Sequence, residues 1–191
     1  MAAIQVGFAV TGSFCTLDRA LEQMKRLADL GYSILPIFSE HTATMDTRFG
    51  KAEDFIQQAE KISGRSVIRS IVDAEPIGPQ KMTDIMVVAP CTGNTLGKLA
   101  LGITDTTVTM AVKSHLRRGK PVVLAVSTND AMSASAQNIG RLMNVRHMYF
   151  VPFRQDSASI KPTSLVADFS QIPQTVENAL EEKQLQPVIL S

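Results

Sequence analysis

The chain has 191 residues, of which 45% are hydrophobic and 19% are charged, and its formal net charge is +1. This length suits one α/β core, so we expect a single domain over residues 1–191, and the near-neutral charge argues against nucleic acid and against a membrane surface as partners. No apolar run approaches the roughly 18 residues that a membrane span needs, and no signal peptide precedes the first expected strand, which favours a cytoplasmic protein.

The beginning of the chain has the pattern of a β-α-β unit. Residues 4–10 are an apolar run that leads into Thr11-Gly12-Ser13. Hydrophobic residues recur at helical spacing over residues 16–30, and residues 32–38 form a second apolar run that leads into Ser39. This pattern is typical of the core of a doubly wound sheet.

The most informative stretch lies in the middle of the chain. Residues 85–90 are a short apolar run rich in β-branched residues, which is typical of a strand buried in a parallel sheet. The small polar residues 92–95 follow, and a helical pattern then resumes. Free backbone N–H groups and the helix dipole would both point into such a loop, so we expect it to bind an anionic ligand.

The other segments alternate between helix and strand patterns. We expect helices over residues 51–63, 67–74, 105–116, 131–143 and 172–182, and strands over residues 122–126 and 147–151. We expect residues 75–79 and 117–121 to be turns, the polar residues 154–163 to be a loop, and residues 185–191 to be an edge strand or to pack on a neighbour. The alternation predicts a three-layer α/β sandwich with a Rossmann-like, mainly parallel sheet and helices on both faces.

Four polar loops would leave such a sheet at the same edge, where open α/β sheets bind ligands. Gly12 would let the backbone approach a ligand, and the hydroxyl and amide groups could donate hydrogen bonds to a phosphate. The alternative is that these residues are ordinary helix caps. The candidate cofactor-binding residues are Thr11, Gly12, Ser13, Ser39, Pro90, Thr92, Gly93, Asn94, Thr95, Ser127 and Thr128.

Other common sites have weak support in the sequence. Residues 7–13 do not match G-x-G-x-x-G, and there is no P-loop, so NAD or a nucleoside triphosphate bound through those motifs is disfavoured. The cysteines and histidines lack metal-ligand spacing, and we expect no metal. Cys15 and Cys91 are either thiols activated at helix N-termini or small buried side chains.

The residues 90–95, Pro-Cys-Thr-Gly-Asn-Thr, resemble the Pro-Ala-Ser-Ala-Asn-Thr motif of the homo-oligomeric flavin-containing cysteine decarboxylase family. The resemblance covers roughly residues 4–150. It implies that the loops at the sheet edge bind FMN, where neighbouring copies meet in a trimer or in a dodecamer of trimers. The catalytic histidine of that family would fall near Pro76, where this chain has none. Residues 126–133 keep Asn129 and Met132 of a second family motif but lack its proline and tryptophan, so we do not expect cysteine decarboxylation.

Seven segments spread over nearly the whole chain carry a closer resemblance: residues 10–16, 47–50, 74–79, 89–94, 127–131, 152–156 and 184–187. They resemble the family of dipicolinate synthase B subunits. The resemblance implies a flavoprotein-like subunit that helps to oxidise dihydrodipicolinate to dipicolinate in the mother cell of a sporulating bacterium. Its partner would be the A subunit of dipicolinate synthase, which resembles nicotinamide-dependent dehydrogenases and would bring NADP.

If this resemblance holds, the substrate is a small dicarboxylate. Arg48 is then the best candidate for a bidentate carboxylate clamp and Arg154 the second, whereas Asn129 could donate to a carboxylate oxygen. His41 and Asp130 are candidates for the acid or base. Two alternatives stay open: a non-catalytic partner that assembles or activates the dehydrogenase component, and an FMN-dependent decarboxylase with altered catalytic groups.

Overall fold

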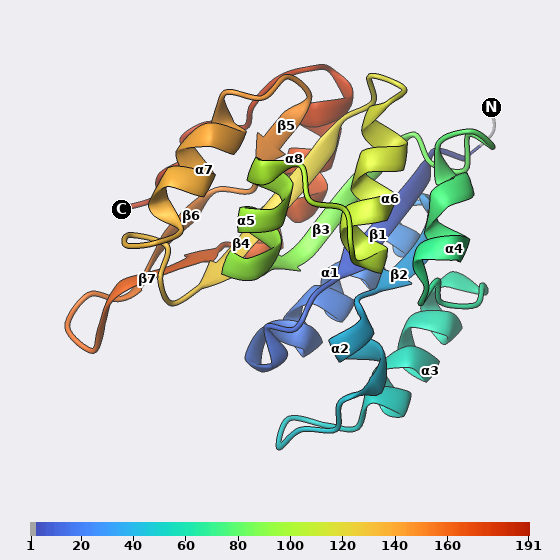
Figure 1. Cartoon of the computed structure of the whole chain (residues 1–191), viewed down its shortest axis with the longest axis horizontal. Coiled ribbons are helices and arrows are strands. Elements are labelled where there is room, and N and C mark those ends of the chain that lie inside the picture. The colour runs from blue at the N-terminus through green and yellow to red at the C-terminus, as the bar shows by residue number, and fades with distance from the viewer. Residues whose placement is uncertain (1–2) are drawn as a thin grey trace.

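The computed structural model describes residues 3–191, which form a seven-stranded sheet with helices on both faces (Figure 1). The strand order is β2-β1-β3-β4-β7-β6, and β5 also pairs with β4. Strands β1 to β5 pair in parallel, whereas β7 pairs antiparallel with both β4 and β6. The strands are β1 (Gln5–Val10), β2 (Ser33–Phe38), β3 (Ile85–Cys91), β4 (Val122–Thr128), β5 (Met148–Phe150), β6 (Phe153–Ser157) and β7 (Lys161–Ala167).

Helices cover the sheet in two layers. Figure 1 shows α5 and α6 in front of the sheet and α1 and α8 behind it. The helices are α1 (Leu17–Asp29), α2 (Glu40–Thr44), α3 (Ala52–Ser63), α4 (Ile71–Ala74), α5 (Gly93–Leu101), α6 (Thr107–Leu116), α7 (Ala136–Met143) and α8 (Ile172–Leu180). The predicted fold class, a three-layer α/β sandwich with a mainly parallel sheet, is confirmed.

The burial of the strands explains their composition. All seven residues of β3 are buried, because neighbouring strands flank it and helices lie on both of its faces. A strand of this kind has no solvent side and is apolar throughout. The order β2-β1-β3-β4 places the carboxyl ends of four parallel strands next to one another. The predicted meeting of four loops at one sheet edge follows from this order.

The prediction that residues 154–163 form a loop is wrong. They belong to an antiparallel hairpin, β6 and β7, in which β7 also pairs Val166 and Leu165 with the last two residues of β4. The hairpin lies at the end of the sheet, and much of β6 is exposed. Its polar side chains therefore reflect exposure to solvent rather than an irregular backbone.

Several element boundaries also differ from the prediction. The helix expected from residue 131 begins at Ala136, because the carbonyl oxygen of Asp130 accepts from the N–H groups of Ser133 (3.0 Å) and Ser135 (3.1 Å) in a preceding turn. Of the helix expected over residues 67–74 only α4 forms, since Ile68 bridges Ile37 of β2. The expected turn at residues 75–79 contains a 3-10 helix. The short helix α2 was not predicted.

One buried titratable group lies away from the carboxyl edge of the sheet. His115 of α6 is fully buried; its Nδ1 bonds the Thr83 hydroxyl (2.7 Å) and its Nε2 the Pro121 carbonyl oxygen (3.0 Å). A carbonyl only accepts, so Nε2 carries the proton and Nδ1 accepts from Thr83. Burial, the largest cause, lowers the pKa of His115 from 6.5 to about 4.

Acid should therefore destabilise the protein through His115. Between pH 6.5 and about 4 the unfolded chain binds a proton that the folded chain does not, so the free energy of unfolding falls as pH falls. The loss should reach about 3 kcal/mol. Urea denaturation at several pH values measures it. His115→Gln, which cannot gain this proton, should flatten the pH dependence in that window, and an unchanged slope would contradict the assignment.

Candidate functional site

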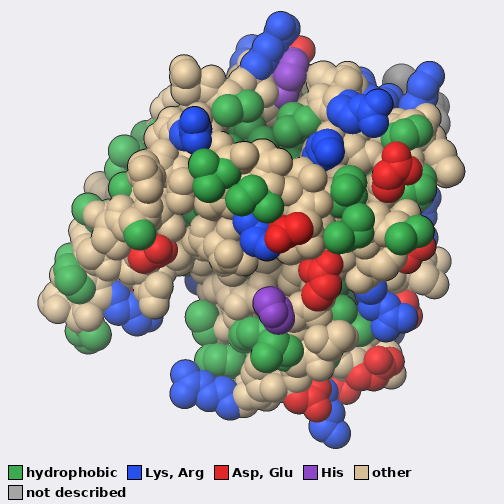
Figure 2. Space-filling view, viewed as in Figure 1, with side chains coloured by type: hydrophobic (Ala, Val, Ile, Leu, Met, Phe, Trp, Pro, Cys, Tyr) green, Lys and Arg blue, Asp and Glu red, His purple; other side chains and the backbone are tan. Residues whose placement is uncertain are grey.

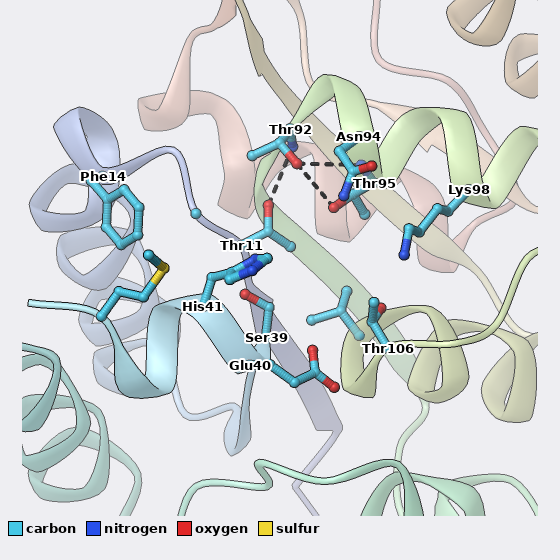
Figure 3. Close-up of a pocket in the computed structure, with 13 residues that line it drawn as sticks. Thr11, Phe14, Ser39, Glu40, His41, Thr92, Asn94, Thr95, Lys98 and Thr106 are labelled. Carbon is cyan, nitrogen blue, oxygen red and sulfur yellow. Dashed lines mark hydrogen bonds between the residues drawn. The ribbon is translucent and has the colours of Figure 1, made fainter.

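A cavity of about 400 Å³ opens at the carboxyl edge of the sheet, beside the ends of β1, β2 and β3 (Figure 3). Cavities of this size hold small organic ligands and cofactors. Most of the lining residues carry hydroxyl, amide, imidazole or charged groups, and three apolar side chains complete the wall. The lining residues are Thr11, Gly12, Phe14, Ser39, Glu40, His41, Met45, Thr92, Asn94, Thr95, Lys98, Thr106 and Val108.

The amino end of α5 forms one wall of the cavity. Thr92 caps this helix, since its Oγ1 accepts from the N–H of Thr95 (3.3 Å). The N–H of Thr92 donates to Thr11 Oγ1 (3.2 Å), and that hydroxyl donates to the carbonyl oxygen of Pro90 (2.7 Å). The end of β1 is thus fixed to the start of α5. The first N–H groups of the helix, those of Gly93 and Asn94, have no acceptor within it.

The second loop supplies another cap. The N–H of Thr42 donates to the hydroxyl of Ser39 (3.3 Å), which also shares a hydrogen bond with the Thr42 hydroxyl (2.9 Å). The capping alternative is therefore correct for Ser39 and Thr92, but both side chains also line the cavity. Figure 3 shows Ser39 and Thr92 on opposite sides of Thr11, with His41 pointing toward Thr11.

Two charged side chains in the cavity are held by neighbours. Glu40 Oε1 accepts from the N–H and the hydroxyl of Thr107, both at 2.8 Å, and so caps α6 from the opposite wall. Lys98 Nζ forms an ion pair with Asp105 Oδ1 at 2.7 Å, and the Lys98 side chain is 22% exposed. The cavity therefore combines one lysine, one carboxylate already in use, and the positive end of the α5 dipole.

The fourth loop does not line this cavity. Ser127 at the end of β4 instead shares a hydrogen bond with Ser13 (2.9 Å), and Thr16 donates to the Ser13 hydroxyl (3.0 Å). This hydroxyl cluster connects the first and fourth loops. Of the predicted binding residues, Thr11, Gly12, Ser39, Thr92, Asn94 and Thr95 line the cavity, whereas Ser13, Pro90, Gly93, Ser127 and Thr128 do not.

The candidate catalytic residues are spread more widely. Only His41 lines the cavity. Arg48 lies in the loop between α2 and α3, with its guanidinium 4.8 Å from the ring centroid of Phe49. Asn129 is exposed in the loop after β4. Arg154, on β6, forms an ion pair with Asp168 at 3.5 Å.

The two cysteines differ in environment. Cys91 ends β3 and is fully buried, and this burial raises the pKa of its thiol, which favours an inert side chain. Cys15 is exposed. Within residues 3–191 no group of three or more His, Cys, Asp or Glu side chains is close enough to hold a metal ion. None of the helices in the same range is both long and apolar enough to span a membrane.

The sequence did not single out several residues of the cavity wall. Lys98 and Thr106 come from helix patterns that looked ordinary, and Glu40 and Met45 belong to α2 or follow it directly. A signal was present for Lys98, since it lies one helical turn after Asn94 and therefore on the same face of α5. No comparable signal marks Phe14 or Val108.

Comparison with known proteins gives consistent results along the chain. The family described as flavoprotein matches residues 1–179. The B subunit of dipicolinate synthase from Bacillus subtilis (strain 168) is 41% identical over 186 residues, which cover 97% of this chain and 93% of that protein.

Solved structures agree with this match. The crystal structure of the dipicolinate synthase B subunit from Bacillus halodurans superposes with a TM-score of 0.91 and 44% identity, covering 100% of this chain and 97% of that one. The FMN-dependent cysteine decarboxylase SpaF has a TM-score of 0.67 at 21% identity, covering 94% of this chain and 96% of its own. At that identity, the likeness to SpaF shows the fold alone.

Proposed function

The chain belongs to the flavoprotein family, and from this premise we propose that it acts as the B subunit of a dipicolinate synthase. In this role it binds FMN and helps to oxidise dihydrodipicolinate, a small dicarboxylate, to dipicolinate during sporulation. Its partner is an A subunit that binds NADP, and both act in the cytoplasm of the mother cell. The observation that carries the proposal is the cavity at the sheet edge, with its hydroxyl and amide groups, in a chain similar to two such B subunits over nearly its whole length.

The residues of the cavity fit FMN. The N–H groups at the start of α5 and the hydroxyls of Ser39, Thr92 and Thr95 offer donors to a phosphate and to a polyol chain. Lys98 adds a positive charge at the same wall, and Phe14 and Met45 offer an apolar surface to a flat ring. When bound, FMN would supply the redox chemistry of the reaction.

The side chains of the protein would position the reactants. The ion pair with Asp105 restricts the orientation of the Lys98 side chain. Glu40 fixes the start of α6 and so maintains the opposite wall of the cavity. Arg48 and Asn129 are our candidates for binding the substrate carboxylates. His41 is the candidate for proton transfer, because either nitrogen of its imidazole can carry a proton and the side chain points into the cavity (Figure 3).

A homo-oligomer, a trimer or a dodecamer of trimers, is part of the proposal. Figure 2 shows hydrophobic side chains gathered over the face that α4, α5 and α6 form. Exposed hydrophobic residues on or next to these helices include Val72 (80% exposed) on α4, Leu101 (63%) at the end of α5, and Ile103 (41%) after α5. Exposed apolar side chains gathered on one face commonly mark a contact with another protein.

A second candidate is a non-catalytic partner that activates the A subunit. It is favoured by the engagement of Glu40 with Thr107 and of Lys98 with Asp105, which leaves His41 as the one other side chain of the cavity lining that can transfer a proton. The decarboxylase alternative gains no support, since Pro76 lies in the 3-10 helix before β3 and does not line the cavity.

The visible absorption spectrum of the purified protein tests the proposal. We expect a flavin spectrum, or its appearance on adding FMN, with about one FMN per chain after heat release. Bound flavin that dihydrodipicolinate reduces in a single turnover would support catalysis. A protein that neither carries nor takes up FMN would overturn the flavin mechanism and favour the activating partner.

A further inference from the structure

The helix α5 and the loop after β4 touch at an unusually close contact. A Cβ atom built on Gly93 would lie 2.7 Å from Asp130 Oδ1, 2.7 Å from Thr128 Oγ1 and 2.8 Å from Ser135 Oγ. Real Cβ atoms do not approach other atoms this closely. Gly97, one turn later in the same helix, would meet only Asn138 Nδ2 at 3.5 Å. The three oxygen atoms therefore leave no room for a Cβ atom at position 93, and glycine is the residue that fits there.

Asp130 is the residue that organises these oxygen atoms. Its Oδ1 accepts hydrogen bonds from the hydroxyls of Thr128 and Ser135, the latter at 3.0 Å. Its carbonyl oxygen accepts from the N–H of Ser133 at 3.0 Å and of Ser135 at 3.1 Å. The backbone carbonyl of Asp130 thus accepts the hydrogen bonds of the turn after β4, and its carboxylate orients the two hydroxyls that face Gly93.

The hairpin fixes the same loop from its other side. The N–H of Met132 donates to the carbonyl oxygen of Thr163 (2.9 Å), and the Thr163 hydroxyl donates to the carbonyl oxygen of Asn129 (2.6 Å). The backbone of Asn129 is therefore held, while its side chain is exposed at the sheet edge.

We propose that Asp130 is a positioning residue that locks the loop after β4 onto the start of α5, and so fixes the N–H groups of α5 that face the cavity. This inference rests on the proposed function for the identity of the ligand. It assigns Asp130 no proton transfer: the residue acts through the geometry of Thr128, Ser135 and Gly93.

The charge of Asp130 adds a directional effect. A carboxylate beside the start of a helix is stabilised by the helix dipole. Here it occupies the β4 side of α5 and would repel an anion there, so we expect an anionic group of a ligand to approach the free N–H groups from the cavity side.

A double-mutant cycle on the ligand-free protein tests the lock. Gly93→Ala should lower Tm by about 5 °C, because the added Cβ would overpack the contact with the three oxygen atoms. In the Asp130→Ala background the same change should cost less than half as much, because the carboxylate is gone and the two hydroxyls can rotate away. Gly97→Ala is the matched control and should not lower Tm. Equal costs of Gly93→Ala in both backgrounds would overturn the proposal.

FMN titration, followed by quenching of flavin fluorescence, tests the consequence for binding. Asp130→Ala should weaken FMN affinity by about 10-fold, a loss typical of a displaced binding group. Asp130→Asn should stay within about threefold of the parent protein, because its amide oxygen can still accept both hydroxyl hydrogen bonds. Equal losses for the two variants would contradict a positioning role. A parent protein that binds no FMN would overturn the proposed function, while the Tm cycle would still decide on the lock.

Discussion

Gly12→Val should abolish FMN binding, with affinity reduced by more than about 100-fold, while leaving the fold intact. Gly12 lines the cavity, and its Cβ would sit between the Phe14 ring, at 3.5 Å, and His41 Cβ, at 4.0 Å. Both distances are ordinary contacts, so the protein itself has room for the added Cβ atom. A branched side chain at this position would instead fill the space that the ligand needs.

The measurement is an FMN titration together with a thermal unfolding curve. Tm should be unchanged or slightly higher, because replacing glycine reduces the entropy of the unfolded chain where no strain results. Gly140→Ala, at a helical position with no atom within 4 Å of the added Cβ, is the control and should bind FMN normally. If Gly12→Val binds FMN with parental affinity, the flavin does not occupy this cavity.

The sheet edge was the most predictable part of this protein. Thr11, Ser39 and Thr92 each follow directly on an apolar run, and a parallel sheet brings such residues together whatever their distance in sequence. The pattern fixes where a strand ends, so it also locates the residue that follows it. This is why three of the four predicted loops line one cavity.

The opposite wall of the cavity was not predictable in this way. Glu40 reaches Thr107 only because α2 and α6 lie beside each other, and the pairing of helices leaves no periodic signal. The hairpin of β6 and β7 was missed for a related reason. Most of β6 and the start of β7 are exposed, so the side chains there are polar and give no apolar alternation.

The fourth loop lies at the sheet edge where the sequence predicts it, but its residues do not line the cavity. Ser127 and Thr128 do lie at the predicted edge, but they face Ser13 and Gly93 rather than the cavity. Strand order gives the neighbourhood of a side chain, whereas its direction depends on strand register and on local turns. Here the Ser127 hydroxyl is held by Ser13 and the Thr128 hydroxyl by Asp130.

Arg48→Ala should reduce, by about 100-fold or more, the kcat/KM of the protein reconstituted with its A subunit, because a bidentate guanidinium–carboxylate pair contributes two charge-assisted hydrogen bonds. Arg48 is exposed, and hydrogen bonds fix the loop that carries it. Thr47 and Gly50 exchange backbone hydrogen bonds of 3.0 and 3.2 Å, and Asp46 Oδ1 accepts from the N–H of Ala52 (3.0 Å). A rigid loop that presents an arginine suits the recognition of a carboxylate.

The comparison of Arg48→Ala with Arg48→Lys and Arg154→Ala makes the test specific. Lysine keeps the charge but not the planar fork, so Arg48→Lys should recover only a small part of the lost activity. Arg154 already pairs with Asp168, and we expect Arg154→Ala to have a smaller effect. FMN affinity should be unchanged in Arg48→Ala, because Arg48 does not line the cavity. Unchanged kinetics in Arg48→Ala would show that Arg48 does not bind the substrate carboxylate. That result would favour Asn129 or a residue of the A subunit in this role.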